Sequence, residues 1–409
     1  MESSIDWTRH PAMIVWTDDW NMCAWAPDQA TWEKTRHLPF MQTRWSSGTL
    51  ETAPEVESLF DVLRRHRSGD GLPVTFEAYY VVGNPDFDAI RANGFQHYVD
   101  VGIDAGVPDS WQRGPFLAKA KEGVEEGIWR PEYHFRSHHF SAENWMRRLR
   151  NNDPVAREMF ELHMYVSETV PERTNENDEP FPDPFGWIRT GVERFERAFG
   201  YAPTSIRNHE QDHEPIAAAG IRTATLADKG DGFPATGTRS TKADLFHMGR
   251  CLDFEPFMSD DMDEVLGTAK SAIADRLTLN TPAILSSHRR NYASFAGDVE
   301  RNLACLDALL GHLEATYPDM TYLINDEVRQ LWESGVSTRH FGGNVLVRNW
   351  TDAGTRSVPL QHPAGWRATG VETLRQFGSG ESPQIDAAGT QVVVPPGDYR
   401  VTMERTENE

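Results

Sequence analysis

Short apolar runs alternate with longer amphipathic segments over most of the chain. The apolar runs predict strands near residues 13–16, 72–82, 95–103, 204–207, 222–226, 252–254, 282–287 and 321–324. Apolar positions at helical spacing predict helices near 51–65, 117–127, 141–149, 154–169, 184–199, 260–277, 298–317 and 326–332. Strands and helices in alternation indicate an α/β fold, with a parallel sheet closed or nearly closed into a (β/α)7–8 barrel.

The pattern changes beyond Gly335. Short alternating strands separated by Gly and Pro turns are predicted at 344–350, 355–360, 390–394 and 399–403. We therefore expect two domains, a barrel over 1–335 and a small β-sandwich over 338–409. The second domain is expected to brace the barrel, and sugar binding is the alternative role.

Polar residues that could bind a metal occur in two segments of the chain. Asp18 and Asp19 end the first run, where adjacent carboxylates repel unless a cation or a proton compensates them. His134 and His138 would share one face if their segment is helical. One Asp and two His form an open three-ligand site for a divalent transition metal. The alternatives are a turn or helix cap at the DD pair and a chance HxxxH among the 15 histidines.

Two further polar residues stand at predicted strand ends. Arg207 ends the strand at 204–207, and His288 follows the strand at 282–287. Barrels of this kind carry their chemistry at the C-terminal ends of the strands. Four separate segments therefore supply polar side chains to one edge of the predicted barrel.

Charge and composition limit the classes of molecule that the protein is expected to bind. A net charge of −22 argues against nucleic acids and anionic membranes as partners, because both need a basic footprint. No apolar run approaches the roughly 18 residues of a membrane span, and no signal sequence is evident, so we expect a cytoplasmic protein. The 13 Trp residues exceed what packing requires and suit stacking on sugar rings, although core packing is the stronger expectation for Trp20, Trp25 and Trp145. The oligomeric state stays open.

The ordered motifs resemble those of the polysaccharide deacetylases, the NodB-homology group similar to carbohydrate esterase family four. The resemblance rests on Thr17-Asp18-Asp19, His134-x3-His138, Arg207, an acidic strand near Asp253, and His288 before a long helix. It covers roughly residues 10–333 and implies the barrel of that family. It also implies a metal-dependent hydrolase that removes N- or O-acetyl groups from a poly- or oligosaccharide.

The resemblance assigns roles to single residues. Asp18 matches the general base, and Asp19, His134 and His138 match the ligands of a divalent transition metal, with Zn expected and Ni or Co as alternatives. Arg207 would orient the base, and His288 would match the general acid. Asp253 is the weaker candidate for the acid that tunes this histidine.

The sequence departs from the family pattern at residues expected to bind substrate. Trp20 replaces the glycine of the first motif, and Arg207 is followed by Asn-His instead of Pro-Tyr. We expect substrate contacts from residues near the first, third and fifth motifs: Trp20, His209, Glu210, Asp212, Arg289 and Tyr292.

Two other functions stay open. The first is a glycoside hydrolase in which Asp18 or Asp19 acts with Glu210 or Asp212. The second is a non-catalytic carbohydrate-binding protein that retains the metal site. Product identity distinguishes the first from a deacetylase, and turnover distinguishes the second.

Overall fold

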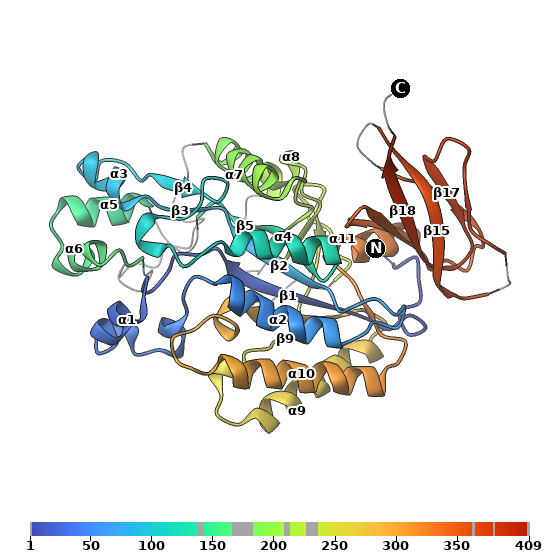
Figure 1. Cartoon of the computed structure of the whole chain (residues 1–409), viewed down its shortest axis with the longest axis horizontal. Coiled ribbons are helices and arrows are strands. Elements are labelled where there is room, and N and C mark those ends of the chain that lie inside the picture. The colour runs from blue at the N-terminus through green and yellow to red at the C-terminus, as the bar shows by residue number, and fades with distance from the viewer. Residues whose placement is uncertain are drawn as a thin grey trace.

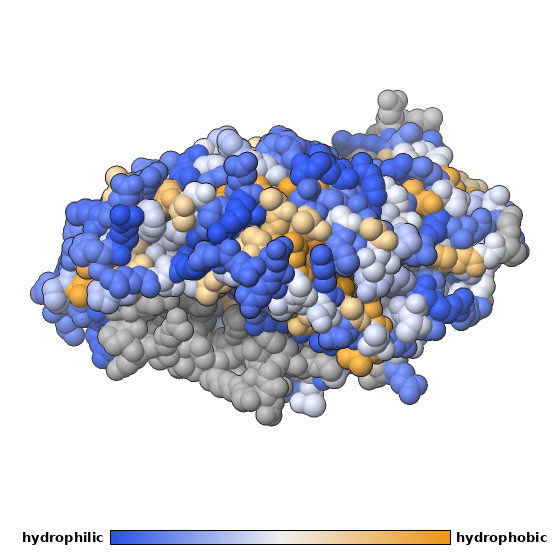
Figure 2. Space-filling view, turned by 90° about the horizontal axis from the view of Figure 1, so that it is seen from below, coloured by the Kyte–Doolittle hydropathy of each residue, from blue (hydrophilic) through white to orange (hydrophobic). Residues whose placement is uncertain are grey.

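The computed structural model describes residues 2–137, 142–165, 183–207, 213–225, 236–361, 365–378 and 381–406. The sheet of the larger part of the molecule is surrounded by helices, and the C-terminal strands form a separate lobe at one end (Figure 1). On the face shown in Figure 2, hydrophobic residues occur in small groups among hydrophilic ones. Among the described residues, no helix combines the length and apolar character needed to cross a membrane.

The central sheet has nine strands, and all its strand pairs are parallel. The order along the sheet is β8-β7-β6-β5-β2-β1-β10-β9, and β11 also pairs with β1. The strands are β1 Ala12–Trp20, β2 Phe76–Val81, β5 Trp129–Phe135, β6 Ser205–Arg207, β7 Thr223–Thr225, β8 Phe246–His247, β9 Leu252–Asp253, β10 Ala283–His288 and β11 Thr321–Tyr322. This parallel sheet confirms the predicted fold class.

The two ends of the sheet lie close together. Strands β8 and β9 occupy opposite ends of the strand order, yet only residues 248–251 connect them. Phe246 of β8 also shares a buried apolar cluster with Ile14 of β1 and Ile284 of β10. The sheet therefore curves into an open barrel, in which the chain between β8 and β9 bridges the seam.

Helices surround the sheet in the order α9, α10, α2 and α4, with α7 beside α8 (Figure 1). Their bounds are α1 Gln29–Thr35, α2 Ala53–Arg65, α3 Phe87–Ala92, α4 Phe116–Glu126, α5 Ala142–Arg150, α6 Pro154–Glu161, α7 Pro184–Phe199, α8 His213–Ala218, α9 Met262–Thr278, α10 Val299–Thr316 and α11 Asn325–Ser334. Helix α2 begins at a capping box, in which Thr52 and Glu55 satisfy each other's backbone N–H groups. Its apolar face, which includes Leu59 and Phe60, is buried against the core.

The alternation of side chains along β1 separates two cores. Met13 and Val15 belong to the large cluster between sheet and helices, whereas Ile14 and Trp16 belong to a cluster inside the barrel. Leu331 of α11 joins the inner cluster, so this helix covers the inner face of the sheet. The period of two along the strand also assigns Asp18 to the inner face.

Beyond Gly335, whose left-handed conformation (φ 73°) ends α11, every strand pair is antiparallel. One sheet has the order β12-β13-β18-β15 and the other β14-β17-β16. The strands are β12 Val336–Phe341, β13 Asn344–Asn349, β14 Arg356–Pro359, β15 Trp366–Gln376, β16 Gln384–Ile385, β17 Gln391–Val394 and β18 Gly397–Arg405. Val345 of the first sheet and Val392 of the second belong to one buried cluster.

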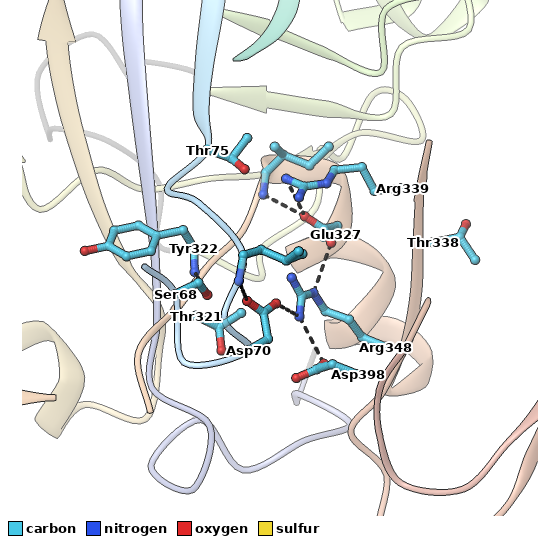
Figure 3. A network of polar contacts seen from close by, with 12 residues as sticks. Ser68, Asp70, Thr75, Thr321, Tyr322, Glu327, Thr338, Arg339, Arg348 and Asp398 are labelled. Atoms are coloured by element: carbon cyan, nitrogen blue, oxygen red, sulfur yellow. Dashed lines mark hydrogen bonds and ion pairs between the residues drawn. The ribbon is translucent and has the colours of Figure 1, made fainter. Parts of the chain in front are cut away.

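A buried ionic network joins this lobe to the barrel (Figure 3). Arg348 of β13 pairs with Asp70 at 2.7 Å, with Glu327 of α11 at 3.1 Å and with Asp398 of β18 at 3.0 Å. We call these four residues the junction network. Burial opposes the charge of Asp70, but Arg348 outweighs it and lowers the pKa of the carboxyl group.

Several described elements differ from the sequence-based expectation. Helices α1 and α3 lie in segments for which no element was predicted. The short strand β4 Asp100–Gly102 lies within the strand predicted at 95–103 and pairs with β3 Gly83–Pro85. Strand β8 was not predicted, because two residues are too few to show a periodic pattern.

Candidate active site

The bulge at Asp19 brings two consecutive carboxylates to one site. Neighbouring residues of a regular strand point to opposite faces of the sheet. Here Asp19 has a positive φ of 71°, and the register between β1 and β2 shifts between Thr17 and Trp20. Both carboxylates consequently contact polar residues at the C-terminal edge of the sheet, which we call the rim.

Asp18 is held by a buried arginine. Arg207, at the end of β6, donates from Nε to Oδ2 of Asp18 at 2.7 Å, and both side chains are almost completely buried. The other oxygen, Oδ1, is buried and accepts no hydrogen bond from any residue that the structure describes. Asp18 is therefore an oriented carboxylate with one oxygen available for a proton or a ligand.

His288 lies beside Asp18 in the parallel register of β1 and β10. Its Nε2 is 3.7 Å from Oδ2 of Asp18, and its Nδ1 is hydrogen-bonded to Glu255 at 2.5 Å. Asn291 donates to the second oxygen of Glu255 at 2.7 Å. Burial disfavours the imidazolium, but Glu255 outweighs it and raises the pKa of His288 to about 10.

Glu255 therefore replaces Asp253 as the acid beside this histidine. Asp253 is exposed and pairs with Arg250 at 2.5 Å. Glu255 follows β9 by two residues and lies outside the strand predicted at 252–254. An acid just beyond a strand end was the signal that could have identified it.

Asp19 and His134, two of the three predicted metal ligands, lie close together. Oδ1 of Asp19 is 3.5 Å from Nε2 of His134, which lies within β5 rather than on a helix. The helical reason for pairing His134 with His138 was therefore wrong for His134. The predicted third ligand, His138, lies outside the described residues, which contain no group of three or more potential metal ligands.

The donor chemistry nevertheless fits a divalent transition metal. A carboxylate and an imidazole nitrogen converge, and both belong to the ligand set of zinc. The neighbouring Oδ1 of Asp18 is buried without a hydrogen-bond donor among the described residues. Burying such an oxygen is unfavourable unless a ligand, a water or a proton compensates it.

Two further residues at the rim were not predicted. Arg250 lies near Asp18 and Arg207, and burial together with the charge of Arg207 lowers its pKa to about 10. The half-buried ring of Trp45 meets His288 edge to face, with 5.0 Å between ring centroids. Trp45 lies in a short 3-10 helix, Arg44–Ser47, for which no element was predicted.

Three residues predicted to contact substrate are buried instead. Trp20 packs edge to face on Trp129 in the large core, and Tyr292 is hydrogen-bonded to Ser287. Arg289 donates to the backbone oxygen of Met22 at 2.8 Å and pairs with Glu51 at 3.2 Å. All three side chains are buried in the floor below the rim, which for Trp20 agrees with the expectation of core packing.

The other predicted substrate contacts, His209, Glu210 and Asp212, lie outside the described residues. The paired carboxylates of the glycosidase alternative include Glu210 or Asp212 and stay a prediction for the same reason. Trp25 and Trp145 are buried, in agreement with the expectation of core packing.

No protein-family model and no curated protein matches the chain in sequence. Among solved structures, the chain is similar to a 4-alpha-glucanotransferase from Thermococcus litoralis (9% identity, 78% of this chain and 40% of that chain, TM-score 0.40). It is also similar to a probable polysaccharide deacetylase from Pseudomonas aeruginosa (8% identity, 79% and 91%, TM-score 0.40). A third structure is a family 4 carbohydrate esterase from Streptomyces lividans (9% identity, 77% and 92%, TM-score 0.33). At these identities and TM-scores, none of the matches assigns an activity.

Proposed function

We propose that the protein is a metal-dependent hydrolase that removes acetyl groups from a carbohydrate. The observation that carries the proposal is the rim itself, where an oriented carboxylate and a histidine paired with a buried acid face each other. Asp18 and His288 approach to 3.7 Å, beside the converging Asp19 and His134. Deacetylation needs a base, an acid and a means of polarising the acyl group, and these four residues match that need.

Asp18 is the general base. Arg207 occupies its Oδ2 and fixes the carboxylate, which leaves Oδ1 to accept a proton from the attacking water. Because Arg207 is itself buried, the pair keeps its orientation before substrate arrives. This arrangement lowers the cost of reorganisation in the transition state.

His288 is the general acid. Glu255 holds the proton on Nδ1 and stabilises the imidazolium, so that Nε2 carries the proton to be delivered. Loss of the acyl group requires that this proton reach the leaving nitrogen or oxygen of the sugar. The half-buried Trp45 beside His288 is suited to pack against the sugar ring that leaves.

Asp19 and His134 are the described residues that would hold the metal, and His138 is the proposed third ligand. A divalent transition metal there supplies a Lewis acid for the acyl oxygen and lowers the pKa of water. Zinc fits the mixed carboxylate and imidazole donors, with nickel or cobalt as alternatives.

The activity test is release of acetate from acetylated chito-oligosaccharides and acetylated xylan. Wild-type protein is expected to release acetate from one of these classes, and Asp18→Asn and His288→Ala are expected to lose it. Asp263→Asn, an exposed residue in the first turn of α9, is the matched control and should behave as wild type. Acetate release that survives in Asp18→Asn, with the fold intact, would remove Asp18 as the base.

Metal content is measured separately by plasma mass spectrometry. About one transition-metal ion per chain is expected in wild type, with loss in His134→Ala and retention in the exposed-histidine control His97→Ala. Equal metal in wild type and His134→Ala would overturn the proposed ligand set.

A further inference from the structure

A second cleft lies at the opposite end of the barrel, between the barrel and the C-terminal lobe. It has a volume of about 1060 Å³, and residues from β5, α11, β12 and β14 line it. Arg130 of β5 lines the cleft, and it precedes His134 of the rim by four residues, roughly 13 Å along the strand. This junction cleft is therefore separate from the proposed active site.

The lining of the junction cleft is basic, although the chain is acidic overall. Four arginines line it, and the only aspartate or glutamate among its described lining residues is Asp326. That aspartate is already paired with Arg329 at 2.8 Å. A basic concavity on a chain with a net charge of −22 focuses positive potential locally and favours an anionic ligand.

Arg339, one of the arginines of the cleft, has unused hydrogen-bond donors. Arg339 is 5% exposed, and its Nε and Nη1 have no hydrogen-bond partner among the described residues. Its closest acid, Glu327, is 3.6 Å away and already pairs with Arg348. A buried guanidinium without acceptors is costly, and an unseen ligand is one reason for a protein to retain it.

Arg130 contributes a second, partly satisfied guanidinium. It donates from Nε to Glu132 at 2.9 Å, and its guanidinium stacks on the ring of Tyr201 with 4.1 Å to the centroid. That is its one hydrogen bond to the part of the chain that the structure describes. Arg130 and Arg339 are close enough that the charge of Arg130 contributes to the lowered pKa of Arg339, a lowering caused first by burial. An anion between the two guanidinium groups would accept hydrogen bonds from both and reduce their mutual repulsion.

Arg356 is a third arginine of the cleft, at its outer edge. This exposed residue of β14 lines the cleft, and its side chain forms no ion pair or hydrogen bond with a described residue. Thr204, Thr338 and Gln330 add polar groups to the walls. The volume is at the upper end of the range for small-molecule sites, so a sugar-sized ligand fits the cleft.

We infer that the junction cleft binds an anionic saccharide, a sugar that carries a carboxylate or a phosphate group, with its anionic group between Arg130 and Arg339. Arginine guanidinium groups bind both anions through paired hydrogen bonds. The site is independent of deacetylation at the rim, because it uses none of the rim residues.

The test is isothermal titration calorimetry on the full chain with four probes. These are glucuronate, glucose 6-phosphate, inorganic phosphate and neutral glucose. Binding of glucuronate or glucose 6-phosphate is expected to be at least tenfold tighter than binding of glucose. Comparison of these two probes identifies the anionic group, and tight binding of inorganic phosphate alone would contradict a saccharide site.

Variants locate the binding. Arg339→Gln is expected to weaken it at least tenfold, and Arg356→Gln severalfold, whereas the exposed control Arg367→Gln on β15 should bind as wild type. If Arg339→Gln fails to fold, the exposed Arg356→Gln carries the test. Failure of all the anions to bind, or unchanged affinity in both cleft variants, would overturn the inference whatever the rim catalyses.

Discussion

The rim and the junction network both bury arginines and carboxylates, but they leave them in different states. In the junction network, each oxygen of Asp398 has a partner: Oδ1 accepts from Trp350 at 2.7 Å, and Oδ2 accepts from Arg375 at 2.8 Å. At the rim, Oδ1 of Asp18 has no donor among the described residues. Saturated carboxylates hold two parts of the molecule together, whereas an unsaturated one is available for chemistry.

Backbone conformation shows the same contrast. Arg348 and Asp398 lie in regular antiparallel strands whose register pairs them directly. Asp19 lies at a bulge with a positive φ, which is unfavourable for a residue with a side chain. Strain of this kind persists where surrounding structure enforces it, and here it turns a second carboxylate toward the site.

The largest expected effect is at the rim. Asp18→Asn should lower the rate of acetate release by about 100- to 10,000-fold, because the amide cannot accept a proton from water. The free energy of unfolding should change far less than activity. Steady-state kinetics with urea denaturation of the same preparation check both expectations, and a parallel loss of stability and activity would make Asp18 a structural residue like those of the junction.

The next effect is at the junction. Arg348→Met should lower the free energy of unfolding by about 3–5 kcal/mol, because it leaves three buried carboxylates without their shared cation. Urea denaturation measures it. Arg400→Met is the matched control, since Arg400 lies on β18 of the same sheet in an exposed pair with Glu372. A loss no larger in Arg348→Met than in this control would mean that the network does not stabilise the junction.

A pH profile of activity tests whether Glu255 is the carboxylate that raises the pKa of His288. Catalysis requires the imidazolium, so activity is lost as the pH rises through the pKa of His288, about 10 in the wild type. Glu255→Gln removes the charge that raises this pKa and should move the basic limb to lower pH. If the pKa returns to about 6.5, activity at pH 8 falls about thirtyfold through protonation alone.

Asp253→Asn is the control for that profile. Its carboxylate pairs with Arg250 and not with His288, so the basic limb should stay in place. A shift in Asp253→Asn without one in Glu255→Gln would restore the assignment made from sequence.

The smallest predicted effect concerns Glu77, a buried acid between the rim and the junction network. Glu77 of β2 accepts hydrogen bonds from Tyr79 at 3.0 Å and from the backbone of Asn325 at 2.6 Å, and it forms no ion pair with a described residue. Burial and the neighbouring Glu132 raise its pKa to about 8. Its carboxyl group therefore stabilises the fold below the unfolded pKa and loses that contribution as the pH rises to about 8.

Glu77→Gln should remove part of this pH dependence. Between pH 5 and 8, the free energy of unfolding of the wild type should fall more than that of the variant. Thermal denaturation across this range measures the difference. Identical pH profiles would show that Glu77 is compensated as fully as the acids of the junction network.

The sequence predicted the rim residues that stand at ends of regular strands. Asp18, Arg207 and His288 follow apolar runs, and parallel strands bring their C-terminal ends to one edge. Glu255 and Trp45 were missed because they lie outside the predicted elements, Glu255 two residues beyond β9 and Trp45 in a short 3-10 helix.

The sequence alone also did not show which candidate residues are buried. The aromatic ring of Trp20 and the cation of Arg289 look like groups that bind a sugar, yet both are buried below the site. A single sequence does not distinguish a residue that lines a site from one that supports it. The bulge at Asp19 was equally invisible, because no glycine marks the positive φ.

The most direct test of the proposed function is the identity of the product. Purified wild-type protein is incubated with an acetylated chito-oligosaccharide, and the products are analysed by mass spectrometry together with an acetate assay. Deacetylation predicts free acetate and a sugar of unchanged chain length, with both signals lost in Asp18→Asn. Shortened sugar chains without acetate would contradict it and indicate a glycoside hydrolase.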